Sequence, residues 1–230
     1  MHTMEDGISF GLILPENAKD VADFLLSNFF PNEPISRALE LPPNQVQRWF
    51  TPTIIGSVQQ ECCIQAIDIK TGQIVGVAIN ILVEKNLQEP ESVGEGRGLL
   101  DLLDVTEPVM VEIAKFLGFL NQVPMQVYKP GMDTDGRVRT VNCVYLNVLP
   151  AYCGKGIGKT LVDKSEVIAR EKNAAYMQVD TTSEFSYRIF NRCGFSVIRE
   201  IPLAGHLRNI ESIDNGVHKQ GRILLKKIRP

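Results

Sequence analysis

The stretch Leu146-Asn-Val-Leu-Pro-Ala-Tyr-Cys-Gly-Lys-Gly-Ile-Gly-Lys-Thr-Leu161 decides the fold of this chain. The residues from Thr140 to Val148 are mostly β-branched, apolar or aromatic, which predicts a strand, and Pro150 ends it. From Gly158 onward, apolar residues return at helical spacing. The sequence therefore predicts a strand, a glycine turn and a helix, in that order.

The glycine turn has the features of a phosphate-binding loop. Gly154, Gly156 and Gly158 let consecutive backbone N–H groups converge without steric conflict from side chains. The helix that follows adds unpaired amides and the positive end of its dipole. Lys155 and Lys159 add positive charge beside the turn. We therefore expect the backbone of this turn to bind a phosphate group.

Other interpretations of the turn are weaker but remain open. The dinucleotide pattern G-x-G-x-x-G fails, because Lys159 stands where its last glycine is required. The P-loop pattern matches at Gly158-Lys159-Thr160, and Asp180 could hold magnesium. Cys153 replaces its first glycine, however, and too little chain follows for the parallel sheet of a P-loop protein. An ordinary strand-to-helix turn is the remaining alternative.

Composition and charge restrict the class of protein. With 230 residues, 44% of them hydrophobic, we expect a single domain over residues 1–230. The net charge of −3 argues against nucleic-acid binding and favours a cationic partner. No run of 18 apolar residues occurs, and the first residues do not resemble a signal peptide. We expect a cytoplasmic protein that does not bind membranes.

Cysteines and histidines give no pattern for a metal site. The spacing of the five cysteines matches neither a zinc site nor a disulfide framework, so we expect reduced thiols. None of the three histidines lies in a recognisable motif. No metal is expected.

Periodicity gives the remaining elements by residue range. We expect helices over 15–29, over 44–50 with a continuation past Pro52, over 107–121, from 158 onward and over 183–192. We expect strands over 8–14, 62–69, 73–83, 140–148, 174–181, 195–201 and 222–228, and loops over 29–35 and 86–98.

The central stretch resembles the acetyl-CoA motif of the GNAT superfamily of N-acetyltransferases. The pattern V-x-P-x-Y-x-G-x-G-I-G-x-x-L is followed by a strand and then by R-I-F-N-R-C-G-F. The family's [Q/R]-x-x-G-x-[G/A] falls on Cys153, Gly156 and Gly158, with cysteine in place of Gln or Arg. The resemblance implies an α/β fold with a mixed sheet of about seven strands flanked by helices. It also implies acetyl-CoA as cosubstrate, bound by a core of about residues 138–195.

The resemblance assigns acetyl-CoA binding to two segments and one side chain. The backbone of the strand before the turn is expected to bind the acyl oxygen where a bulge opens the strand. This segment is Leu146, Asn147 and Val148, and the turn and helix start comprise Cys153, Gly154, Lys155, Gly156, Ile157, Gly158 and Lys159. The side chain is that of Phe190, which occupies the position at which many members of the family carry a catalytic tyrosine.

A second, shorter resemblance concerns the acceptor. The segment Phe29-Phe-Pro-Asn-Glu-Pro-Ile35 is similar to F-F-x-x-E-P-L of insect arylalkylamine N-acetyltransferases, which acetylate dopamine, serotonin and related amines. The Thr182-Ser-Glu-Phe-Ser186 stretch and the insertion at 86–98 also suit that subfamily. The resemblance implies that Glu33 is the general base. A polyamine or other small-amine acetyltransferase, and a CoA-binding module without turnover, are the alternatives.

The chemistry of amine acetylation supports a role for Glu33. An alkylamine with a pKa near that of lysine, about 10.4, is protonated at neutral pH and needs a base before it can attack a thioester. Glu33 lies among Phe29, Phe30, Pro31 and Pro34, so we expect its carboxylate to be desolvated. The alternative is a solvent-exposed glutamate in a loop, with no catalytic role.

The leaving group and the route complete the expected mechanism. A thiol with a pKa near 8.5, about that of cysteine, needs only a weak acid. We favour the Ser186 hydroxyl and then that of Ser183 for this role, against plain hydrogen bonding or helix capping. We expect direct attack in a ternary complex, with a small-molecule amine as the partner of a monomeric enzyme. A covalent route through Cys143 or Cys153 is the alternative.

Overall fold

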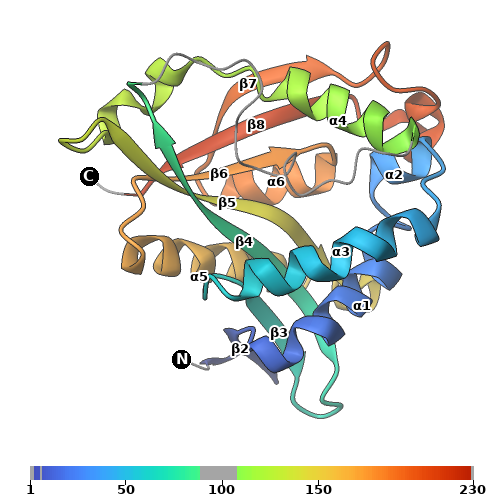
Figure 1. Cartoon of the computed structure of the whole chain (residues 1–230). Coiled ribbons are helices and arrows are strands. Elements are labelled where there is room, and N and C mark those ends of the chain that lie inside the picture. Colours follow the sequence, from blue (N-terminus) through green and yellow to red (C-terminus); the bar gives the residue numbers. More distant parts are fainter. Residues whose placement is uncertain (1–2, 6, 89–107, 229–230) are drawn as a thin grey trace.

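The computed structural model describes residues 3–5, 7–88 and 108–228. Within these ranges the strands form an eight-stranded sheet in the order β1-β2-β3-β4-β5-β6-β8-β7 (Figure 1). The strands are β1 Thr3–Glu5, β2 Ile8–Leu12, β3 Ile64–Asp68, β4 Ile74–Asn86, β5 Arg137–Val148, β6 Tyr176–Thr181, β7 Ser196–Pro202 and β8 Gln220–Lys227. β5 and β6 run parallel, and the other pairs are antiparallel. The predicted α/β fold with a mixed sheet is confirmed, and the short strand β1 is the one that the sequence did not predict.

Helices cover both faces of the sheet. They are α1 Ala18–Asn28, α2 Pro34–Ala38, α3 Pro43–Val58, α4 Pro108–Leu120, α5 Ile157–Glu171 and α6 Glu184–Arg192. Short 3-10 segments lie at Pro15–Asn17, Met125–Gly131, Pro150–Tyr152 and Ile210–Gly216. α1 and α3 pack with β4 and β5 on one face, where α4 also covers β7 and β8, and α5 and α6 cover the opposite face (Figure 1). None of the described helices has the length and apolar character needed to cross a membrane.

Two helix predictions were wrong in detail. α3 runs without interruption through Pro52, although the sequence predicted a break there. Phe50 and Ile54, on either side of Pro52, are completely buried, and their burial outweighs the hydrogen bond that the proline removes. The helix α2 was also not predicted. Most of the predicted loop over 86–98, residues 89–98, lies outside the described residues.

The divergence of β5 from β6 positions the site. The two strands pair only from Thr140 to Cys143, opposite Tyr176 to Val179. β5 then continues to Val148 beside β4 alone among the described strands. The register with β4 shifts after Cys143, which leaves Val144 as the extra residue of a bulge. The strand bulge that the sequence predicted is confirmed, and it creates a free edge from residue 144 onward.

Candidate active site

The glycine turn forms an open cradle of backbone amides. Gly154 and Gly156 both have a φ of +79°, the left-handed conformation that glycine adopts most easily. Gly156 is the N-cap of α5 and provides no side-chain cap. Among the described residues, no acceptor pairs with the amide N–H groups of residues 154–159. These amides are therefore available to an anionic ligand at the positive end of a 15-residue helix.

The side chains of the cradle divide into two groups. Cys153, Lys155 and Lys159 are exposed, whereas Ile157 belongs to the core beneath α5. Gly158 is buried, and a Cβ atom there would lie 3.1 Å from Ile189 Cδ1, so glycine lets α5 approach α6. The two lysines have partners within the chain. Lys159 Nζ pairs with Asp163, and Lys155 Nζ lies 4.6 Å from the centre of the Tyr152 ring.

The free edge of β5 presents a second set of backbone donors. Leu149 donates its N–H to the Val75 carbonyl at 2.9 Å, so this residue faces β4. In an antiparallel pair, successive residues direct their N–H and C=O groups to opposite edges. The N–H groups of Leu146 and Val148 therefore point away from β4, toward the gap that opens beside β6. The predicted acyl-binding segment thus has its polar backbone available to a ligand.

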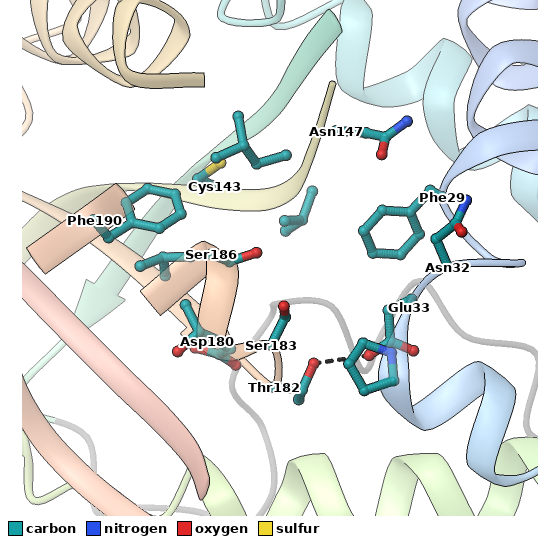
Figure 2. A pocket seen from close by; sticks show the side chains of 15 residues that line it. Phe29, Asn32, Glu33, Cys143, Asn147, Asp180, Thr182, Ser183, Ser186 and Phe190 are labelled. Carbon is teal, nitrogen blue, oxygen red and sulfur yellow. Dashed lines mark hydrogen bonds between the residues drawn. The ribbon is translucent and has the colours of Figure 1, made fainter. Parts of the chain in front are cut away.

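A cavity of about 140 Å³ lies beside this edge (Figure 2). It is bounded by β5, the end of β6, the start of α6 and the loop before α2. Six of the predicted site residues line it, namely Glu33, Leu146, Asn147, Ser183, Ser186 and Phe190. Val148 and residues 153–159 do not line it. The structure therefore separates the predicted residues into a cavity and an adjoining cradle.

Glu33 is held by four donors from its own helix and from a distant segment. It is the N-cap of α2, and its two carboxylate oxygens accept from Ile35 N at 3.1 Å and from Ser36 N at 2.7 Å. The Ser36 hydroxyl donates at 2.8 Å, and the hydroxyl of Thr182, which follows β6, also donates at 2.8 Å. The surroundings of the half-buried carboxylate are therefore more polar than its sequence neighbours predicted. Because α2 begins at Pro34, the sequence signal for this cap was the Glu-Pro pair.

An aromatic cluster fixes the loop that carries Glu33. The Phe29 and Tyr145 rings meet edge to face at 5.2 Å, and Phe30 meets Phe50 at 4.9 Å. Tyr145 also contacts Phe50 at 5.2 Å. Burial raises the pKa of the Tyr145 phenol, so this ring stays neutral. The cluster joins the loop to β5 next to the strand bulge.

The two predicted serines have different surroundings. Ser183 is the N-cap of α6, and its hydroxyl accepts from Phe185 N at 3.2 Å. The Ser186 hydroxyl has no hydrogen-bond partner in the part of the chain that the structure describes. Figure 2 shows its oxygen directed into the cavity. Of the two, Ser186 is therefore the hydroxyl that is available to a ligand, and Ser183 also has a structural role.

Neither Phe190 nor the two candidate cysteines gives the cavity a catalytic hydroxyl or a reactive thiolate. Phe190 is buried against Phe195, with ring centres 5.1 Å apart, so no hydroxyl occupies this position. Burial raises the pKa of the Cys143 thiol to about 12, which disfavours a thiolate nucleophile in the cavity. Cys153 is exposed and lies outside the cavity. Within the described ranges, no group of side chains is suited to hold a metal ion.

Three cavity residues were missed or given other roles by the sequence. Thr182 joins Glu33 to the end of β6, and Asp180 lines the cavity two residues earlier. Asn147 was assigned to the cofactor by its backbone, but its side-chain Nδ2 is buried without a partner among the described residues. The signal for Thr182 was its place beside Ser183 in the quoted stretch, whereas nothing local marked Asp180 as a cavity residue.

These features fit acetyl-CoA. The unpaired amides of the cradle suit a pyrophosphate, and the N–H groups of Leu146 and Val148 suit the acyl and amide oxygens of the thioester arm. At Gly154 and Gly156, the position of an added Cβ is open space, where a ligand can approach the backbone. When bound, acetyl-CoA supplies an acyl group activated as a thioester.

Comparisons with known proteins identify the class. A family model described as Acetyltransferase (GNAT) family matches residues 39–195, which is more than half of the chain. By class, the protein is therefore an acetyltransferase that uses acetyl-CoA. It belongs to the GNAT family. A search among curated proteins gives no significant match.

Solved structures with the same fold include several amine acetyltransferases. Arylalkylamine N-acetyltransferase 2 from Aedes aegypti is 26% identical with a TM-score of 0.77, covering 97% of this chain and 100% of that chain. A polyamine N-acetyltransferase from Drosophila melanogaster is 19% identical with a TM-score of 0.71, covering 96% and 99% of the two chains. A mutant agmatine N-acetyltransferase is also 19% identical, with a TM-score of 0.74 and coverage of 96% and 100%. At 19% identity, these two similarities concern the fold alone.

Proposed function

We propose that this enzyme transfers an acetyl group from acetyl-CoA to the primary amine of an arylalkylamine, by direct attack in a ternary complex. The observation that supports this most strongly is the hydrogen bond between Glu33 and Thr182 at the wall of a cavity that also reaches the free edge of β5. A carboxylate, a hydroxyl and the backbone donors of β5 thus share one cavity. Phe29 and Phe190 give this cavity aromatic walls that suit an aryl group.

The arrangement suggests how a proton leaves the amine. Glu33 already accepts four hydrogen bonds, which fill the acceptor positions of a carboxylate. The Thr182 hydroxyl can accept a proton from the ammonium group while it donates its own proton to Glu33. This exchange leaves a neutral amine, a neutral Glu33 and an intact hydroxyl. Glu33 is therefore the final base, and Thr182 carries the proton to it.

An assay of CoA thiol release, which follows acetyl transfer directly, tests the proposal with a panel of acceptor amines. We expect turnover with dopamine, serotonin and tryptamine, and much less with spermidine or a lysine peptide. CoA alone should raise the melting temperature, because a ligand that binds only the folded state stabilises it. Stabilisation by CoA without turnover of any amine would show a binding module. A clear preference for spermidine would replace the arylalkylamine class with the polyamine class.

Ser186→Ala is expected to lower kcat by about 10- to 100-fold, because a thiolate is already a fair leaving group and the hydroxyl only protonates or orients it. Ser183→Ala is expected to lower kcat within the same range. It should also lower the free energy of unfolding by about 1 kcal/mol, since its hydroxyl caps α6. Steady-state kinetics and urea unfolding measure the two effects. Unchanged turnover in the double variant would remove both serines from the mechanism.

A further inference from the structure

Asp180 is a second carboxylate in the acceptor cavity, and the proposed mechanism does not use it. It follows Val179 in β6 and lines the cavity with Thr182 and Ser183 (Figure 2). Its side chain shares a face of the sheet with Gln178, because side chains alternate along a strand. This face is the one that α4 covers, since Asn121, the residue after α4, donates its Nδ2–H to Asp180 Oδ2 at 2.6 Å. Asp180 and Glu33 thus face the cavity from the same side of the sheet.

The neighbours of Asp180 are fixed so that both present N–H groups. Asn121 Nδ2 also donates to the Leu117 carbonyl at 3.0 Å, which sets the orientation of its amide. Gln178 Oε1 accepts from the Tyr128 hydroxyl at 2.5 Å and from Lys85 Nζ at 3.4 Å, so its Nε2 faces Asp180 Oδ1, at 3.4 Å. The position is therefore built for a side chain that only accepts hydrogen bonds.

Asp180 retains acceptor capacity that the described residues do not fill. A carboxylate has about four acceptor positions, and the described residues supply Asp180 with one short and one long hydrogen bond. Glu33, in contrast, accepts four. Burial raises the pKa of Asp180, which reflects the cost of leaving this charge poorly solvated. A donor on the acceptor molecule would reduce that cost.

The positive charge of Lys85, which is attracted to Asp180, determines which kind of hydrogen-bond donor fits. Burial lowers the pKa of Lys85 to about 8, and attraction to Asp180 opposes that shift. The attraction between Lys85 and Asp180 offsets part of the carboxylate's charge, from a position outside the cavity lining. A second ammonium or guanidinium group would add an uncompensated charge near Lys85. A neutral hydroxyl satisfies the free oxygen without that penalty.

From this geometry, and resting on the proposed arylalkylamine activity, we propose that Asp180 accepts a hydrogen bond from a hydroxyl group on the acceptor's ring. The enzyme would thereby select hydroxylated arylalkylamines over their unhydroxylated analogues. Two residues of extended chain separate Asp180 from Thr182, which is about 7 Å. A hydroxyphenylethylamine such as tyramine can span this length with its amine at Thr182 and its ring hydroxyl at Asp180. The ring itself would contact Phe29 and Phe190.

The test compares matched pairs of acceptors in wild type and in Asp180→Asn. We expect wild type to favour tyramine over phenylethylamine, and serotonin over tryptamine, by about 10- to 100-fold in kcat/KM. In Asp180→Asn both ratios should fall toward one, because the new amide places an N–H group against a neighbouring donor and weakens the acceptor. The ratio is measured within one preparation, so a partly unfolded variant does not distort it. Asp23→Asn, on α1 and outside the cavity lining, with a side chain that is 49% exposed, is the matched control and should keep the wild-type ratios.

Each outcome has a definite meaning. Equal ratios in wild type and Asp180→Asn would overturn the role of Asp180 while leaving the arylalkylamine activity in place. A preference for putrescine or agmatine that Asp180→Asn abolishes would show that the carboxylate binds a cation instead, and would also overturn the inference. If wild type acetylates none of these amines although CoA raises its melting temperature, the proposed function fails first. Asp180→Leu should invert the preference in favour of phenylethylamine.

Discussion

Gly156→Val is expected to abolish acetyl-CoA binding, with a loss of at least about 100-fold in affinity. A valine at a φ of +79° is strained, and its side chain would fill the open space beside the amides of the cradle. Two lost hydrogen bonds to a charged pyrophosphate correspond to about 3–6 kcal/mol. Isothermal titration calorimetry with CoA measures the effect directly.

Gly7→Val is the matched control for backbone strain. Gly7 also has a φ of +79° and open space around an added Cβ, but it lies in the turn between β1 and β2. Both variants should lose a similar free energy of unfolding, of order 1–3 kcal/mol. Only Gly156→Val should lose CoA binding. Normal CoA affinity in Gly156→Val would show that the cradle is not the cofactor site.

Glu33→Gln is expected to lower kcat by roughly 10² to 10⁴, the usual contribution of a general base. Glutamine keeps the size of the side chain and one oxygen for the α2 amides, but it cannot take up the proton. Acetyl-CoA affinity should not change, because the cradle is separate from the cavity. Thr182→Val, which removes the hydroxyl between the amine and Glu33, should lower kcat without changing CoA affinity.

The dependence of kcat/KM on pH separates catalysis by Glu33 from simple selection of the neutral amine. Amines of different intrinsic pKa should be compared under the same conditions. If an enzyme group controls the rising limb, the limb stays at the same pH for all of them and disappears in Glu33→Gln. A limb that follows the pKa of each amine, together with a nearly active Glu33→Gln, would leave Glu33 with only its role as the cap of α2.

The parts of the fold that depend on local chemistry could be predicted from the sequence. Glycine reaches the left-handed conformation at little cost, so the spacing of Gly154 and Gly156, which both adopt it, indicated the turn and the helix start. Ser183 illustrates a limit of the same approach. Its position at the start of α6 fits both a cap and a catalytic hydroxyl, and the structure shows that the cap is formed.

The parts of the site that depend on distant pairing could not be predicted. The Thr182 hydroxyl meets Glu33 across 149 positions of the sequence, and no local pattern records such a contact. The sequence around Asp180 predicts only that it lies in a strand. Its unfilled acceptor capacity becomes visible only once the structure places Asn121 and Gln178 as its hydrogen-bond donors. The uninterrupted helix α3 is a similar case, because the core around Phe50 and Ile54 overrides the local effect of Pro52.

The aromatic cluster around Tyr145 has a consequence for the energetics of turnover. It connects the loop that carries Glu33 to β5, the strand proposed to bind the acyl group through its backbone. The conformational entropy of this loop is therefore lost once, when the chain folds, and not again at each encounter with an amine. Under the proposed mechanism, the distance between Glu33 and the reacting carbon is then largely set before the substrate binds. Preorganisation of this kind turns the fold itself into part of the rate enhancement.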